Sequence, residues 1–318
     1  MMESRRDCYS AYGFHVKTSF PFRHCRRVSR RPQIEILQRD TAFFAKILEK
    51  LPPQKNDPSI YYHRFGDESE YLRLFHSFHF WISSAGKKIA YQTLVTKDSK
   101  EIQSSLLSCL QCNVLSFAMM KMGIEPIHAS GVVVDRDQAV AFLGDSGLGK
   151  STLTAAFIEE GFPILTDDIL ALRKSDGRFM ASPGTPCIKL FPKTADRIFK
   201  SRHAAAGPMY PLYPKLIFPL RGKRHFKGSV ALRALYLLQD SKAGEKKIRL
   251  RVLTKQKASI ELVKAAYNCM NQSPERLKRQ LFFATELIRK VPVFSLTYPR
   301  DYKYLPQVRE CILRNHRD

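Results

Sequence analysis

The sequence contains no uninterrupted apolar run of the roughly 18 residues that a membrane-spanning helix requires. Residues 1–12 are charged and polar and lack the apolar stretch of a secretory signal. The seven cysteines are scattered from Cys8 to Cys311, without the dense spacing of a disulfide framework. These absences predict a cytoplasmic protein that does not enter a membrane.

Acidic residues are also scarce. The 318 residues include 29 Asp and Glu against 53 Lys and Arg, a formal charge of +24, and no acidic residue lies between Arg197 and Gln239. Such an excess favours polyanionic partners such as nucleotides, acidic peptides, nucleic acid or a membrane surface. The basic stretches lack a nucleic-acid motif with regularly placed aromatic residues, so we do not expect nucleic acid to be the partner.

Patterns for a structural metal are weak. Cys109 and Cys112 have no second pair of ligands, and His76 and His79 have no flanking acidic or cysteine partners. Zinc sites need such convergent sets, so we expect core or surface roles for these side chains. The sequence also has no internal repeat and no low-complexity tract.

The chain is long enough, and at 44% hydrophobic residues apolar enough, for two domains. Residues 1–102 contain short strand-like runs at 34–37, 71–75 and 88–95, which predict a β-rich N-terminal domain. Residues 103–318 begin with a helical pattern over 104–122 and then alternate strand and helix patterns, which end with helices over 260–270 and 274–290 and an apolar strand over 291–296. We therefore expect an α/β domain in the second part.

The most specific motif is a glycine-rich loop between an apolar strand at 139–143 and a helix at 151–160. It reads Gly144-Asp145-Ser146-Gly147-Leu148-Gly149-Lys150-Ser151 and continues with Thr152. Glycines accept positive φ and leave backbone amides uncovered for phosphate oxygens. In a P-loop, Lys150 would neutralise the β- and γ-phosphates and Ser151 would coordinate Mg²⁺. The alternative is an ordinary glycine-rich turn, but the flanking strand and helix favour nucleotide binding.

Asp167 and Asp168 follow an apolar run at 162–165, the next strand after that helix. The carboxyl ends of neighbouring strands in a parallel sheet share one crevice, so we expect both carboxylates to face the phosphates. One would hold the metal, and the other would accept the proton of an attacking hydroxyl. The alternative is a polar strand end followed by a turn.

Two further features have two interpretations each. His128 precedes a hairpin at 131–143 and, considered alone, is typical of a hydrogen-bonded structural histidine. The acid-free stretch contains a loop at 204–228 that either closes over phosphates or is a solvated insertion. Arg221, Lys223 and Arg224 in this loop, together with Lys189 upstream, are the candidate phosphate or substrate contacts.

Together these motifs resemble the catalytic domain of HPr kinase-like proteins, which are also similar to phosphoenolpyruvate carboxykinases. The resemblance spans roughly residues 124–300 and rests on the following segments: Ile127-His128-Ala129-Ser130-Gly131, the loop at 144–152, Thr166-Asp167-Asp168, Ser182-Pro183-Gly184-Thr185-Pro186 and Ile188-Lys189-Leu190-Phe191-Pro192. It implies an ATP- and Mg²⁺-dependent serine kinase. The resemblance also implies that Asp167 is the base, that His128 lies at the active site, and that Asp168 and Ser151 bind Mg²⁺.

Two departures separate the chain from true HPr kinases. The N-terminal part does not resemble theirs, and Thr152 stands where they usually carry Glu. The β-rich part, beginning near Tyr12-Gly13, is similar to that of the kinases of lasso-peptide biosynthesis, which implies a precursor peptide with a C-terminal serine as substrate.

The alternatives are a kinase for HPr or another protein, and a non-catalytic NTP-binding regulator with a basic partner-binding surface. The acceptor, the choice of ATP or GTP, and a homo-oligomeric state stay open.

Overall fold

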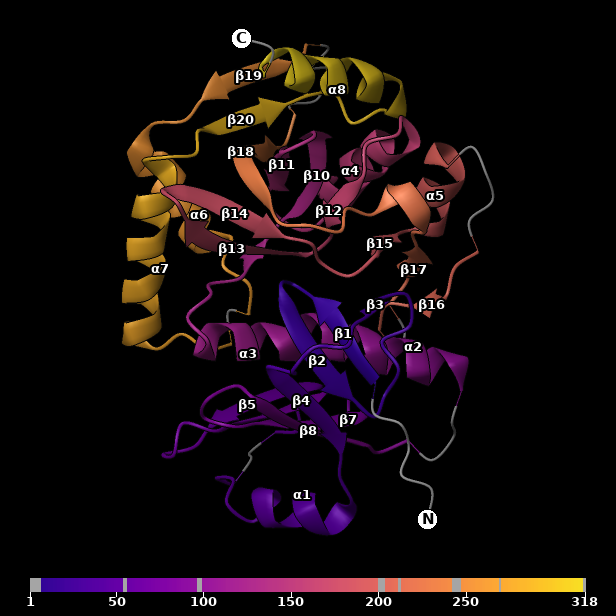
Figure 1. Cartoon of the computed structure of the whole chain (residues 1–318), viewed down its shortest axis with the longest axis vertical. Helices are drawn as coiled ribbons and strands as arrows, with labels where there is room; N and C mark the ends of the chain where they lie inside the picture. Colours follow the sequence, from indigo (N-terminus) through magenta and orange to yellow (C-terminus); the bar gives the residue numbers. More distant parts are fainter. Residues whose placement is uncertain are drawn as a thin grey trace. The chain divides into compact units, whose positions relative to one another are not determined.

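The computed structural model describes residues 7–53, 56–95, 99–199, 204–210, 213–241, 247–268 and 270–316. The chain forms two compact units of mixed α/β structure (Figure 1). The first unit is Met1–Ile124 with Gly207–Pro214, and the second is Glu125–Ala206 with Lys215–Asp318. The division therefore falls after Ile124, and not after residue 102 as the sequence suggested.

The first unit is built on an eight-stranded sheet in the order β3-β1-β2-β4-β8-β7-β6-β5. Alternate residues of β2 are buried, as expected for a strand with one face on a core. The strands predicted at 34–37, 71–75 and 88–95 are confirmed as β4, β6 and β8. The elements are β1 (Asp7–Ala11), β2 (Phe14–Thr18), β3 (Arg26–Arg27), β4 (Ile34–Gln38), α1 (Thr41–Leu48), β5 (Ile60–Arg64), β6 (Glu70–Leu74), β7 (Phe78–Ile82), β8 (Lys88–Thr93) and β16 (Gly207–Pro208).

The helical stretch predicted to open the second part belongs instead to the first unit. It consists of α2 (Lys100–Ser108), a π-helical turn (Cys109–Val114) and α3 (Leu115–Lys121). Phe117 stacks on Tyr62 of β5 with ring centroids 5.3 Å apart, which ties the helix to the first sheet. Within the described ranges, Lys100–Lys121 is the one helix long and apolar enough to cross a membrane, and 78% of its apolar window is buried inside the structure. Such burial is typical of a core helix.

The second unit contains a nine-stranded sheet in the order β12-β10-β11-β18-β14-β13-β9, with β20 pairing both β18 and β19. β11 and β18 are parallel, and β10 is antiparallel to both β11 and β12. Because β10 is antiparallel to both of its neighbours, β11 and β12 run in the same direction. They therefore end at the same edge of the sheet, although β10 lies between them. The strands are β9 (Ile127–His128), β10 (Ser130–Asp135), β11 (Gln138–Leu143), β12 (Ile164–Thr166), β13 (Ile169–Ser175), β14 (Arg178–Ser182), β18 (Val230–Gln239), β19 (Arg249–Val252) and β20 (Val293–Thr297).

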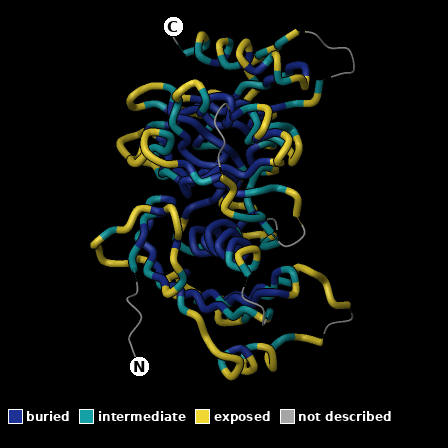
Figure 2. The backbone as a smooth tube through the Cα atoms, turned by 90° about the vertical axis from the view of Figure 1, so that its right-hand side faces the viewer, coloured by how far each residue is buried: buried dark blue, intermediate teal, exposed yellow. Residues whose placement is uncertain are grey.

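Helices cover both faces of this sheet. The apolar side chains of β11 alternate between two cores: Val140 and Phe142 pack with α4 (Lys150–Glu159) and α8 (Leu305–Arg314). Ala139, Ala141 and Leu143 pack on the other face with α6 (Lys255–Lys264) and α7 (Pro274–Ile288). The second unit is thus a three-layer α/β structure, and its central strands are buried along most of their length (Figures 1 and 2).

The remaining elements flank the end of the sheet where β11 and β12 finish. They are β15 (Cys187–Leu190), which pairs with β17 (Leu216–Pro219), α5 (Pro192–Ile198), and the short 3₁₀ helices Gly222–Arg224 and Tyr302–Tyr304. The helix predicted over 260–270 lies earlier, at α6. Thr254 caps its start, and Ala266 forms a β-bridge to Ile127, which ends helical structure before that point.

Candidate active site

The glycine-rich loop connects β11 to α4. Gly149 is the N-cap of α4 with φ 87° and no side-chain cap, so the first amides of the helix are left for another acceptor. Gly144 has φ 130°, and a Cβ there would lie 2.8 Å from the Leu238 carbonyl oxygen. The backbone at this position therefore accepts only glycine.

We predict that Gly144→Ala destabilises the fold by about 1–3 kcal/mol more than Gly161→Ala. Gly161 also has a positive φ, 91°, but a Cβ there would meet nothing within 4 Å, so it controls for backbone strain alone. Urea unfolding of the two variants measures the difference. Equal losses of stability in the two variants would show that the close approach of the Leu238 carbonyl oxygen does not exclude a side chain at residue 144.

Lys150, at the start of α4, is directed back over the loop. Its Nζ donates to the carbonyl oxygens of Gly144 at 2.6 Å and Asp145 at 3.2 Å. Burial lowers the pKa of Lys150. The ammonium is therefore held at the centre of the loop, where an anion would gain a strong, poorly screened partner.

Asp167 follows β12 and is almost completely buried, with 1% of its surface exposed. Its Oδ1 accepts hydrogen bonds from Ser130 Oγ at 2.6 Å and Ser151 Oγ at 2.9 Å, and its Oδ2 accepts from the Lys189 backbone N–H at 2.9 Å. Burial and the neighbouring Asp168 charge raise the pKa of Asp167. Asp167 thus links the loop, β10 and β15, and both of its oxygens are occupied.

Asp168 has different surroundings. Its Oδ2 pairs with Lys189 Nζ at 2.6 Å, and its Oδ1 has no hydrogen-bond partner among the residues that the structure describes. Burial is the largest single influence and opposes ionisation, but the Lys189 charge and hydrogen bond together with the nearby His128 and Lys215 outweigh it and lower the pKa of Asp168 to about 2. Its φ of 70° lies in the left-handed region, which Asp and Asn adopt more readily than most residues with a side chain. Asp168 therefore presents one ionised, unoccupied oxygen.

His128, on β9, is placed beside these groups by the pairing of β9 with β13. Its ring packs edge-on against Tyr267 with centroids 5.7 Å apart. Burial, together with the nearby Lys150 cation, lowers the pKa of His128 to about 4. The imidazole is therefore neutral at pH 7.

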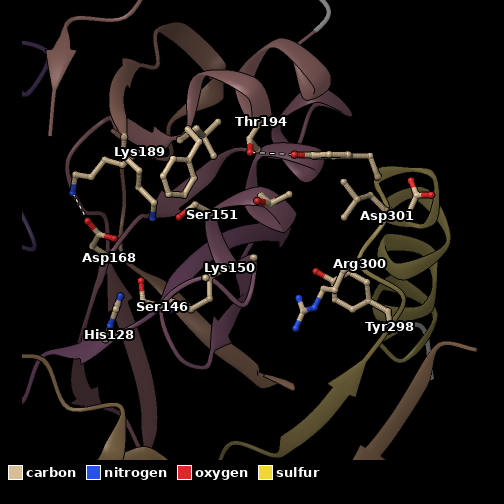
Figure 3. Close-up of a pocket in the computed structure, with 18 residues that line it drawn as sticks. His128, Ser146, Lys150, Ser151, Asp168, Lys189, Thr194, Tyr298, Arg300 and Asp301 are labelled. Carbon is tan, nitrogen blue, oxygen red and sulfur yellow. Dashed lines mark hydrogen bonds and ion pairs between the residues drawn. The ribbon is translucent and has the colours of Figure 1, made fainter. Parts of the chain in front are cut away.

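One cavity of about 280 Å³ brings these side chains together. Lys150 and Ser151 lie at its centre (Figure 3). Asp168, Lys189 and His128 lie toward one end, and the opposite end is formed by the segment that carries Tyr298, Arg300 and Asp301. All of its walls belong to the second unit. The two ends differ in chemistry, because only the end opposite Asp168 carries tyrosines, Tyr298 and Tyr302, beside its charged residues.

The structure sorts the candidate residues from the sequence into three groups. Those that line the cavity are His128, Ser146, Gly147, Gly149, Lys150, Ser151, Thr152, Asp168 and Lys189. Gly144, Asp145 and Leu148 form the rest of the loop, and Asp167 lies beneath it. Arg221, Lys223 and Arg224 do not line the cavity; Arg224 pairs with Glu159 at 3.1 Å instead.

Two cationic residues of the cavity were missed by sequence reasoning. Lys215, from the acid-free stretch, lies 5.5 Å from the Phe191 ring centroid and has no acidic ion-pair partner within the described ranges. Arg300 follows β20, far from any recognised motif. The absence of acidic residues around Lys215 pointed to the right loop, but charge alone does not distinguish a lysine directed into a cavity from one in solvent.

The oxygen atoms near the loop suit a hard cation. Ser151 Oγ and the carboxylates of Asp167 and Asp168 are the ligand types that Mg²⁺ prefers, and Mg²⁺ in nucleotide sites usually keeps several waters and needs few protein ligands. In the described part of the chain no cluster of three or more His, Cys, Asp or Glu side chains could hold a metal by itself. The residues therefore fit Mg²⁺ delivered with phosphate oxygens.

No family model and no curated protein matches the chain. Among solved structures, the chain is similar to the Hpr(Ser) kinase/phosphatase from Coxiella burnetii, with 15% sequence identity. The match covers 61% of this chain and 96% of that one, at a TM-score of 0.32. A similarity of this size carries no conclusion about activity.

Proposed function

We propose that the protein is a Mg²⁺- and ATP-dependent phosphotransferase that phosphorylates a serine hydroxyl of a peptide. The observation that supports it most strongly is the position of Asp168. An ionised carboxylate with one unoccupied oxygen lines the same cavity as Lys150 and the uncapped start of α4. A phosphoryl donor and a hydroxyl acceptor can therefore meet in a single site.

The donor's phosphates belong at the loop. Backbone amides at the N-terminus of α4 and the Lys150 ammonium supply the converging donors that a triphosphate needs. On binding, Lys150 exchanges its bonds to the Gly144 and Asp145 carbonyl oxygens for bonds to phosphate. Ser151, with Asp167 behind it, would hold Mg²⁺, which supplies charge neutralisation on the phosphates when bound.

We propose roles for the two aspartates that differ from the sequence-based expectation. Asp167 has both oxygens bonded to the surrounding frame, so its role here is to orient Ser151. Asp168 Oδ1 is the oxygen that can accept the proton of an attacking hydroxyl. A pKa of about 2 suits this role because phosphoryl transfer demands orientation of the nucleophile more than a strong base.

Lys215 is the candidate for a cation that balances charge on the transferred phosphoryl group. We predict that Lys215→Met lowers kcat about tenfold or more, because a preorganised cation acts most strongly where charge develops. Lys223→Met is the matched control, since Lys223 lies in the same acid-free stretch and does not line the cavity. Steady-state kinetics of both variants with Mg-ATP test this, and equal rates would remove Lys215 from the mechanism.

The choice of a peptide acceptor rests on the sequence resemblance and on the excess of positive charge, +24, which favours an acidic segment in the substrate. The finer proposal is a lasso-peptide precursor with a C-terminal serine. HPr or another protein is the second candidate acceptor. These acceptors differ only in what docks beside Asp168, so the same chemistry serves each of them.

The test is to incubate the protein with Mg-ATP and each acceptor and to read the intact mass of the acceptor. Gain of one phosphoryl group by a serine-containing acceptor, and its loss with Lys150→Met, supports the proposal. Binding of nucleotide without transfer to any serine acceptor would favour the non-catalytic regulator. Absence of nucleotide binding would contradict both the kinase and the regulator hypotheses.

A further inference from the structure

Arg300 lines the Tyr298 end of the cavity and contacts the glycine-rich loop from there. It lies just after β20, and its Nη1 donates to the Leu148 carbonyl oxygen (Figure 3 shows Arg300 beside Tyr298). Its Nη2 donates to the Gln239 carbonyl oxygen at 2.8 Å. The guanidinium carbon lies 4.9 Å from the Tyr298 ring centroid, so a buried aromatic ring supports the cation from one side.

The bond to Leu148 fixes the orientation of one peptide plane. In a planar trans peptide the C=O of one residue and the N–H of the next point in opposite directions. With the Leu148 oxygen held by Arg300, the Gly149 N–H is directed away from the guanidinium. If this plane rotated by half a turn, a carbonyl oxygen would replace that amide and repel a phosphate.

The loop does not fix this plane by itself. Gly149 has φ 87°, in a region where glycine interconverts readily, and the loop around it is rich in glycine. Arg300 connects the peptide to a rigid support, because Gln239 is the last residue of β18, the parallel neighbour of β11. Leu148 thus becomes tied to the sheet that also delivers the loop.

We infer that Arg300 is a positioning residue that keeps the Gly149 amide directed at the nucleotide phosphates. The inference rests on the proposed nucleotide site and adds a residue outside the loop motif to it. Arg300 lines the Tyr298 end of the cavity and contacts the loop at the Leu148 carbonyl oxygen, on the opposite side of the peptide from the Gly149 N–H, so its contribution is to phosphate binding in general and not to the γ-phosphate alone. It therefore affects a diphosphate and a triphosphate equally.

Calorimetric titration with Mg-ADP and with Mg-ATP tests this. Arg300→Lys keeps the charge but cannot bind two carbonyl oxygens in a fixed fork, so it should weaken both nucleotides by the same factor, roughly 10- to 100-fold. Asp240→Asn is the matched control: it removes the ion pair at 3.9 Å between Arg300 and an exposed carboxylate, and affinity should change by less than about twofold.

A second variant and a spectroscopic measurement keep the test independent of folding. Tyr298→Phe keeps the buried ring but removes the hydroxyl that interacts with Arg300. The affinity for both nucleotides should therefore fall, by a smaller factor than in Arg300→Lys. In ¹⁵N-glycine-labelled protein, which has 15 glycines, Mg-ADP should shift the Gly149 amide signal strongly in the wild type and weakly in Arg300→Lys.

Two results would overturn the inference, and a third would contradict the proposed function. Unchanged affinity for both nucleotides in a folded Arg300→Lys protein would show that the loop needs no anchor. Weaker binding of Mg-ATP with unchanged binding of Mg-ADP would show that Arg300 contacts the γ-phosphate directly. Failure of the wild-type protein to bind Mg-ADP would instead contradict the proposed function itself.

Discussion

Asp168→Asn should lower the rate of phosphoryl transfer by about 10²- to 10⁴-fold while leaving Mg-ATP affinity near that of the wild type. Asparagine keeps an oxygen for Lys189 and tolerates the positive φ of 70° at this position, so the backbone is preserved. It lacks the unoccupied carboxylate oxygen that would accept the hydroxyl proton. Single-turnover transfer at saturating Mg-ATP isolates the chemical step from binding.

The matched comparison is Asp167→Asn. In the wild type the Ser151 hydroxyl and the Lys189 backbone N–H both donate to the Asp167 carboxylate. The asparagine amide would turn its NH₂ group, itself a donor, toward one of these two donors. We expect weaker Mg-ATP binding and lower stability for this variant. Transfer at the wild-type rate in Asp168→Asn would exclude Asp168 as the base. Loss of transfer alone in Asp167→Asn, with binding and stability intact, would return that role to Asp167.

Lys189→Met should destabilise the second unit by about 3–5 kcal/mol, because it leaves the buried Asp168 carboxylate without its cation. The contact is buried, because the Lys189 side chain is 2% exposed and the Asp168 side chain 10%. Urea unfolding at neutral pH measures the loss. The double variant Lys189→Met/Asp168→Asn removes the unpaired charge and should recover much of it.

The same pair has a defined pH dependence. The Lys189 ion pair holds the pKa of Asp168 at about 2, below the ordinary value of 3.8, so its stabilisation is present above pH 3.8 and lost as pH falls through about 2. In Lys189→Met the burial of the carboxylate dominates and raises the pKa of Asp168. Stability of that variant relative to wild type should therefore improve as pH falls. A constant difference between pH 7 and pH 4 would contradict the pairing.

The loop, the acidic pair and most regular elements could be predicted from the sequence because local patterns determine them. Glycine spacing and the apolar strand before it place Gly144, and helical periodicity places α4 and α7. Such patterns depend on neighbours within a few residues. They identified Asp167 and Asp168 as site residues, since a strand that ends beside the loop directs its last side chains there.

The different roles of these two aspartates depend on long-range contacts that no local pattern contains. Asp167 is bonded by Ser130, 37 residues away, and Asp168 is paired with Lys189, 21 residues away. Arg300 reaches Leu148 across 152 residues. The domain boundary was misplaced for a similar reason: the apolar face of the helix at 100–121 gives no sign in sequence of which sheet it packs against.

The most direct test of the central claim is a structure with Mg²⁺ and a non-hydrolysable ATP analogue. We expect the β-phosphate against the amides of residues 147–151, the γ-phosphate toward Asp168 and Lys215, and the nucleoside toward the end at Tyr298. A triphosphate bound away from the loop, or with its γ-phosphate at the Tyr298 end, would contradict the proposal that one cavity joins donor and acceptor.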